Sequence, residues 1–285
     1  MDLHDGVSKV NKIAVVLLFR NNADYIAHFS KLCADMERVY TCQFEYYIYE
    51  NDSCDDTVSL LKEFMKHRQG RLWSESLNNQ HISDGTTFTR IQRMVYIRNK
   101  LLDLSREYIT KCDWCLFIDS DIYFDTGDLG TMFRLSPRLN NIVMLTCNTL
   151  DLYRRNSTDA LVPLHVNFVT ECHYYDTFAY VSIDDKHLYP ACNNPQCRHI
   201  TCEKIHNGMQ LSKLADIEMV RSAWAGFVLI QSNIFSHPGI SWKALCIRGN
   251  ESLCEHIHFC DSVRCITQGQ IVRLNDITLF RKNES

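Results

Sequence analysis

The sequence predicts an α/β fold in which a mostly parallel, doubly wound sheet is flanked by helices within a single domain. Strand and helix signals alternate through the first half of the chain, as expected for successive βαβ units. Polar clusters follow three of the expected strands, at the edge where sheets of this kind bind ligands. The chain has 285 residues, 46% of them hydrophobic, so it can bury a sizeable core.

The first expected element is an apolar run that suits a strand buried on both faces. Apolar residues then recur at helical spacing, aromatic residues mark a second strand, and Asp55 or Asp56 can cap the helix after it. In chain order we expect a strand at 13–19, a helix at 23–39, a strand at 44–49, a helix after residue 56, a strand near 71–73, a helix at about 86–108 and a strand at 114–118.

The second half of the chain is less regular. It predicts a strand at 141–146, a strand at 226–231 and a helix from about 252 to 267. The sequence contains no internal repeat, low-complexity segment or flexible linker. We therefore expect one domain with two functional halves.

Charge and hydropathy exclude two kinds of partner. The net charge is -4 and no basic block is present, so a nucleic-acid partner is not expected. The longest apolar run, residues 13–19, is too short to cross a bilayer or to act as a secretion signal, so no transmembrane segment is expected. A glycosylation sequon at Asn51 falls in a loop of the predicted ligand edge, where a glycan would block the site. These features favour the cytoplasm, and the Golgi lumen is the alternative if the sequence is part of an anchored protein.

The chain has 14 cysteines, and the densest group combines three of them with two histidines. Thiolates and imidazoles can hold a structural zinc ion, but the spacing of this group matches no common zinc template. Reduced or disulfide-bonded cysteines are therefore the favoured interpretation. The group consists of Cys192, Cys197, His199, Cys202 and His206.

Two carboxylates follow the strand at 114–118. Asp119 and Asp121 are spaced to meet one hard cation, Mn²⁺ or Mg²⁺, that also takes diphosphate oxygens. Such a D-x-D pair is also common in plain solvated turns, so the pair alone is a weak signal. The apolar strand before it and the aromatic strand after it strengthen the metal interpretation.

The turn Glu50-Asn51-Asp52, read together with the D-x-D pair, resembles a known family. It is similar to the V-D-D-G-S-x-D-G-T segment of family 2-type GT-A glycosyltransferases, with Asp52 in the place of the glycine. The resemblance implies a Rossmann-like GT-A fold, with Glu50 and Asn51 near the base and ribose of a nucleotide sugar. Arg20, just past the first strand, belongs to the same expected donor site.

The helix expected at 252–267 resembles the family's E-D-x-D-L-x-x-R helix. Glu255 then falls on the acidic residue that faces the acceptor, and His256 replaces the usual aspartate base. His258 is a candidate third metal ligand, an acceptor contact or a surface residue. A helix that begins near Ser252 would place Glu255 and His258 on one face and turn His256 about 100° away. Gly226 resembles the small-residue turn that lets the backbone approach the donor sugar.

Two further segments resemble fungal capsule-associated mannosyltransferases and glycosyltransferases of large DNA viruses. They imply that Arg98 contacts the phosphates and that Asp176 contacts the sugar or the acceptor, although a solvated helix charge and a turn residue are the alternatives. The combined resemblance runs from about residue 13 to 276. It assigns residues of about 10–125 to nucleotide binding and about 126–285 to acceptor binding, and it allows the cytoplasm of a virus-infected cell.

The expected function is that of a metal-dependent glycosyltransferase, either a hexosyl- or a pentosyltransferase. It would move a sugar from a UDP- or GDP-linked donor to a hydroxyl of a glycan or glycoprotein acceptor. A catalytically inactive nucleotide-sugar-binding protein is one alternative. A D-x-D phosphatase is another, but its nucleophilic aspartate usually follows the first strand, whereas Asp119 follows the fourth expected one.

Overall fold

Helices and strands alternate through the first half of the protein, as predicted. The computed structural model describes residues 10–77, 87–135, 141–153, 172–174, 178–185, 217–248 and 251–283. The first-half elements are β1 (Lys12–Phe19), α1 (Ala23–Val39), β2 (Gln43–Asn51), α2 (Thr57–Met65), β3 (Gln69–Glu75), α3 (Thr87–Ile109) and β4 (Trp114–Ile118).

The second half contains more strands than the sequence predicts. Two of its expected strands are confirmed as β6 and β10, whereas β9 and the long β13 were not predicted. The elements are β5 (Ile122–Tyr123), α4 (Thr126–Leu135), β6 (Ile142–Tyr153), β7 (Cys172–Tyr174), β8 (Val181–Ser182), β9 (Ile217–Ser222), β10 (Phe227–Gln231), η1 (Ser232–Ser236), β11 (Leu245–Arg248), β12 (Glu251–Leu253), α6 (Glu255–Thr267) and β13 (Gln270–Asn283).

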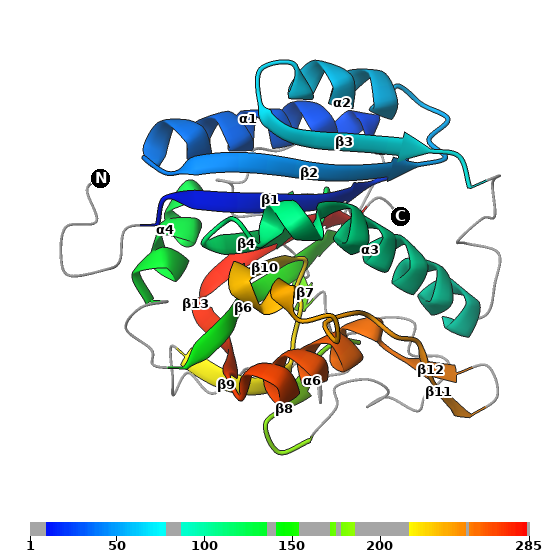
Figure 1. The fold of residues 1–285 in the computed structure, drawn as a ribbon, viewed down its shortest axis with the longest axis vertical. Helices are drawn as coiled ribbons and strands as arrows, with labels where there is room; N and C mark the ends of the chain where they lie inside the picture. Colours follow the sequence, from blue (N-terminus) through cyan, green and yellow to red (C-terminus); the bar gives the residue numbers. More distant parts are fainter. Residues whose placement is uncertain are drawn as a thin grey trace.

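One large sheet runs through the molecule in the order β3-β2-β1-β4-β10-β6-β13-β9-β8 (Figure 1). The pairs β3–β2, β2–β1 and β1–β4 are parallel, which confirms the predicted doubly wound arrangement. β10 inserts antiparallel between β4 and β6, and β13 runs parallel to β6. The sheet is therefore mixed, with its parallel strands concentrated in the first half.

Helices cover both faces of this sheet. Alternate side chains of β1 enter two separate cores, because successive residues of a strand point to opposite faces. Val15 packs in the core with residues of α1, α2 and α4, whereas Val16 packs in the core with residues of α3, η1 and α6. The apolar run at 13–19 is therefore buried on both faces of the sheet, as the sequence predicts.

The start of α6 differs from the prediction. Residues 251–253 form β12, which pairs antiparallel with β11. Because these residues are committed to a strand, the helix begins at Glu255 and Cys254 is its N-cap residue. This later start places both Glu255 and His256 in the first helical turn. Within the described residues, no helix has the length and apolar character needed to cross a membrane.

Candidate functional site

A small pocket lies at the carboxyl ends of β1 and β4. Its walls include residues of those two strands together with Arg98 from α3, Asp119, Trp224 and Trp242. The pocket is thus built from both halves of the chain. It lies at the sheet edge where doubly wound folds bind ligands, as the sequence predicts.

Asp119 sits directly against Gly226. Phe227 of β10 pairs with Ile118 of β4, and the Asp119 N–H donates to the Gly226 carbonyl at 2.8 Å. Gly226 has φ +68°, and a Cβ atom there would lie 3.0 Å from Asp119 Oδ2 and 2.9 Å from Ile122 Cδ1. Only glycine leaves this space beside the carboxylate open. The close approach of this backbone to a donor sugar, which the resemblance implies, stays a prediction.

The turn that carries Gly226 is held from β6. The Thr149 hydroxyl donates to the Ala225 carbonyl at 2.6 Å, and the Thr146 hydroxyl donates to the Trp224 carbonyl at 3.0 Å. Ala225 itself adopts the left-handed conformation, with φ 57°. These threonines were not predicted, because an apolar strand pattern gives no sign of which hydroxyl meets a distant carbonyl.

The Glu50-Asn51-Asp52 turn lies at the end of β2, as predicted. Its carboxylates accept hydrogen bonds from other groups of the protein. Glu50 is 1% exposed, and its carboxylate accepts from the Ser53 N–H at 2.8 Å and from the Ser74 hydroxyl. Asp52 has φ 51° and accepts from the Leu77 N–H at 2.8 Å. These contacts fix the loop between β2 and α2 against the end of β3.

The loop after β1 is joined to the loop after β2. The Asn22 N–H donates to the Thr57 hydroxyl at 2.8 Å, and the Ala23 N–H donates to the Asp55 carboxylate at 3.1 Å. Arg20 begins this loop, and its Nε is buried without a hydrogen-bond partner among the described residues. Hydrogen bonds therefore join the two loops into one rim at the ligand edge of the sheet.

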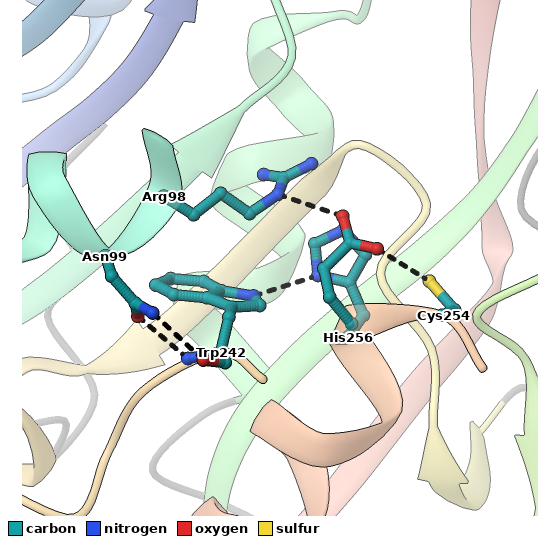
Figure 2. Close-up of polar contacts among 6 residues, drawn as sticks. Arg98, Asn99, Trp242, Cys254 and His256 are labelled. Atoms are coloured by element: carbon teal, nitrogen blue, oxygen red, sulfur yellow. Dashed lines mark hydrogen bonds and ion pairs between the residues drawn. The ribbon is translucent and has the colours of Figure 1, made fainter. Parts of the chain in front are cut away.

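Glu255 is held at the start of α6 by a charged partner from α3. The Arg98 Nε donates to Glu255 Oε1 at 3.3 Å, and the Cys254 thiol donates to Glu255 Oε2 at 3.7 Å (Figure 2). The Arg98 guanidinium also lies over the Trp224 ring, 5.7 Å from its centre. Because Arg98 lines the pocket with Asp119, the ion pair links Glu255 to the predicted ligand edge.

His256 lies beside Glu255 in the interior. Its Nε2 is 3.8 Å from Glu255 Oε1, and its Nδ1 accepts from the Trp242 indole N–H at 3.2 Å (Figure 2). The imidazole stacks on Trp224 with ring centres 4.0 Å apart. Burial, and then the Arg98 charge, lower the pKa of His256 well below its usual value, so the ring is neutral near pH 7. His256 was expected to turn away from Glu255 only in a helix that begins near Ser252. The helix begins at Glu255 instead, and the two side chains lie side by side.

His258 is directed elsewhere. Its Nδ1 lies 3.3 Å from the Ser241 carbonyl oxygen. No three His, Cys, Asp or Glu side chains in the described ranges are grouped to hold a metal ion, so His258 does not join Asp119 and Asp121 in one ligand set. Asp176 and the cysteine–histidine group at 192–206 lie outside the described residues.

Comparison with known protein families identifies the family of this chain. The sequence model of the family described as Cryptococcal mannosyltransferase 1 matches residues 12–265, almost the whole chain. The protein belongs to that family, which confirms the resemblance to fungal capsule-associated mannosyltransferases. The comparison with curated proteins found no match.

The fold of this chain is similar to that of solved structures. TarS of S. aureus, residues 1–349, superposes with a TM-score of 0.52 at 12% identity, over 95% of this chain and 60% of TarS. The mannosyltransferase PcManGT of Pyrobaculum calidifontis, solved with GDP-Man and Mn²⁺, superposes with a TM-score of 0.50 at 10% identity, over 97% of this chain and 59% of that protein. The chain thus spans about 60% of the length of these two structures.

Proposed function

We propose that the protein transfers a sugar from a nucleotide-linked donor to a hydroxyl acceptor, with Asp119 and Asp121 holding Mn²⁺ or Mg²⁺. The observation that carries this proposal is the position of Asp119. It lies at the carboxyl end of β4, lines the pocket together with Arg98, and faces a glycine that leaves space beside its carboxylate. Asp119 also follows the fourth strand of the chain, which counts against the phosphatase alternative.

The residues present fit a metal of this kind. Two carboxylates form a hard oxygen donor set, and Mg²⁺-type ions are commonly bound by one or two carboxylates completed by substrate phosphates. The space that Gly226 leaves beside the Asp119 carboxylate supports such an arrangement, because a larger residue there would crowd the carboxylate. Bound there, the cation would offset the negative charge that develops on the departing nucleoside diphosphate.

The side chains of the protein itself supply the remaining parts of the proposal. Arg98 places a fixed positive charge in the pocket wall, which suits an anionic phosphate. Glu255, paired with Arg98, is the proposed group that assists the acceptor hydroxyl. The rim built from the loops after β1 and β2 is the proposed donor-binding side, so residues of about 10–125 bind the nucleotide and about 126–285 the acceptor.

The donor class is tested by ligand-dependent stability. We expect one nucleotide sugar, tested from a panel of UDP- and GDP-linked sugars, to raise the melting temperature only when Mn²⁺ is present. GDP-mannose is the first to try, because the P. calidifontis structure was solved with GDP-Man and Mn²⁺. A donor at about 100 times its Kd stabilises the folded state by about 2.7 kcal/mol.

Asp121→Ala is the matching variant. It should abolish both the Mn²⁺-dependent shift and sugar transfer, whereas Asp103→Ala, which removes an exposed carboxylate from α3, should leave both intact. Full transfer by a folded Asp121→Ala protein would contradict the metal assignment. Donor binding without transfer or hydrolysis would identify an inactive nucleotide-sugar-binding protein instead.

A further inference from the structure

We propose that Trp242 acts as a positioning residue for Glu255, through His256. In this arrangement the indole N–H fixes the ring orientation and tautomer of His256, and the fixed imidazole in turn orients the Glu255 carboxylate. The inference rests on the proposed function, because Glu255 has a role in transfer only there. Trp242 carries no motif in the sequence, and it lies in an irregular segment between η1 and β11.

The first contact determines the tautomer. An indole N–H is a donor and never an acceptor. The His256 Nδ1 that it meets at 3.2 Å must therefore be unprotonated. In a neutral imidazole the single proton is then on Nε2, the nitrogen that faces Glu255.

The second contact orients the carboxylate. The protonated Nε2 lies 3.8 Å from Glu255 Oε1, the same oxygen that Arg98 contacts at 3.3 Å. The longer distance makes this an electrostatic contact rather than a full hydrogen bond. The opposite tautomer would turn a lone pair toward the carboxylate and repel it. The tautomer thus decides whether His256 attracts or repels the proposed acceptor-side group.

Packing prevents the imidazole from reorienting. His256 is 5% exposed and is stacked on Trp224. Trp242 is 1% exposed and is stacked on Phe259 with ring centres 4.3 Å apart. A ring flip of either side chain would have to displace these neighbours from a close-packed core.

Trp242 is also fixed through its backbone. Asn99 exchanges two hydrogen bonds with it: the amide Nδ2 donates to the Trp242 carbonyl, and the Trp242 N–H donates to Asn99 Oδ1, both at 2.9 Å (Figure 2). Asn99 follows Arg98 on α3. One turn of that helix therefore carries both the arginine that pairs with Glu255 and the asparagine that holds the backbone of Trp242. The pocket wall and the positioning residues therefore share one support.

The tautomer is measured directly by NMR of protein with ¹⁵N-labelled histidine, with the His256 signals assigned by their loss in His256→Gln. Wild-type His256 should carry its proton on Nε2. Trp242→Phe should give a mixture of tautomers, whereas Trp114→Phe, the same change at the far end of β4, should give none. A wild-type proton on Nδ1, or an unchanged tautomer in Trp242→Phe, would overturn the inference.

Kinetics test the consequence for transfer. Trp242→Phe should lower kcat by roughly ten- to a hundredfold, the usual scale for loss of a positioning partner. Gln at position 256 can accept from the indole and donate to Glu255, so His256→Gln should retain more activity than His256→Phe. Equal kcat values for these two His256 variants would contradict the role of the contact.

The two proposals fail in different ways. If wild-type protein transfers no sugar from any donor of the panel, the proposed function is wrong, and the NMR result still decides whether Trp242 sets the tautomer of His256. If wild-type protein transfers sugar and Trp242→Phe does so at the same kcat, only the positioning role is wrong. If Trp242→Phe does not fold, the comparison of kcat between His256→Gln and His256→Phe still tests the positioning role.

Discussion

Two buried glutamates, Glu50 and Glu255, are held in different ways. Both are almost fully buried, at 1% and 4% exposure. Glu50 accepts from a backbone N–H three residues away and from the hydroxyl of Ser74 on the neighbouring strand. Glu255 meets the guanidinium of Arg98, 157 positions away in the sequence, together with a neutral imidazole and a thiol.

The difference indicates what each carboxylate does. The Glu50 carboxylate accepts hydrogen bonds from neutral groups, so we infer that it stabilises the turn between β2 and α2. The partners of Glu255 include a cation that lines the pocket and a histidine whose tautomer is fixed by Trp242. A carboxylate with such partners suits the proposed transfer of a proton from the acceptor hydroxyl. The comparison therefore predicts that removing the two charges affects different properties.

The largest expected effect comes from Glu255→Gln. This change keeps the size of the side chain but removes its charge, and we expect kcat to fall by about a hundredfold or more, the scale of a positioned acid–base group. That corresponds to about 2.7 kcal/mol of activation free energy. Donor affinity, measured by calorimetry with the nucleoside diphosphate, should be retained. A near-normal kcat would leave α6 as scaffold, and lost donor affinity would mean that Glu255 serves mainly to hold Arg98.

Glu50→Gln should give a smaller effect of a different kind. We expect the free energy of unfolding to fall by roughly 1–3 kcal/mol, because a buried, charge-assisted pair of hydrogen bonds is weakened. Nucleoside diphosphate affinity should also fall, since the turn is the proposed donor-binding rim, whereas kcat should stay within about threefold. Urea denaturation and saturating-donor kinetics measure the two quantities. A kcat loss as large as that of Glu255→Gln would remove the distinction between the two glutamates.

The smallest expected effect is the pH dependence of the free energy of unfolding. It concerns only the surroundings of Glu255, because His256 lies beside that glutamate. The pKa of His256 is lowered by burial and by Arg98, so below about pH 6.5 the unfolded chain binds a proton that the folded chain does not. Stability should therefore fall as pH is lowered, by about 1.4 kcal/mol per pH unit for one such group. Urea denaturation at pH 7 and at pH 5 should show a weaker loss for His256→Gln than for wild type. His67→Gln, at an exposed position, should behave like wild type.

The first half of the fold was predictable because its signals are local. Residues 13–19 of β1 and all of β4 are apolar, and α1 begins and ends at the residues that its periodicity indicates. The second half was less predictable. β13 is 14 residues long, but its hydrophobic pattern is interrupted, and its pairing with β6 joins segments far apart in the chain.

The site was predictable to a similar degree. Asp119 and Gly226 were expected near a common ligand, and the structure brings them into contact through the pairing of β4 with β10. His258 was one candidate for a third metal ligand, and the structure places its Nδ1 near the Ser241 carbonyl. Trp242 and Trp224 were not expected at all, because a tryptophan outside a periodic element gives no sign of what it packs against.

The sequence by itself determined which segments form strands and helices at the ligand edge, and which carboxylates follow them. It could do so because burial at each position leaves a period of two or 3.6 residues along the chain. The tertiary structure alone decided that Arg98 pairs with Glu255, that β12 delays the start of α6, and that Trp242 donates to His256. Such contacts depend on how distant elements pack around one core, and no local period records that packing.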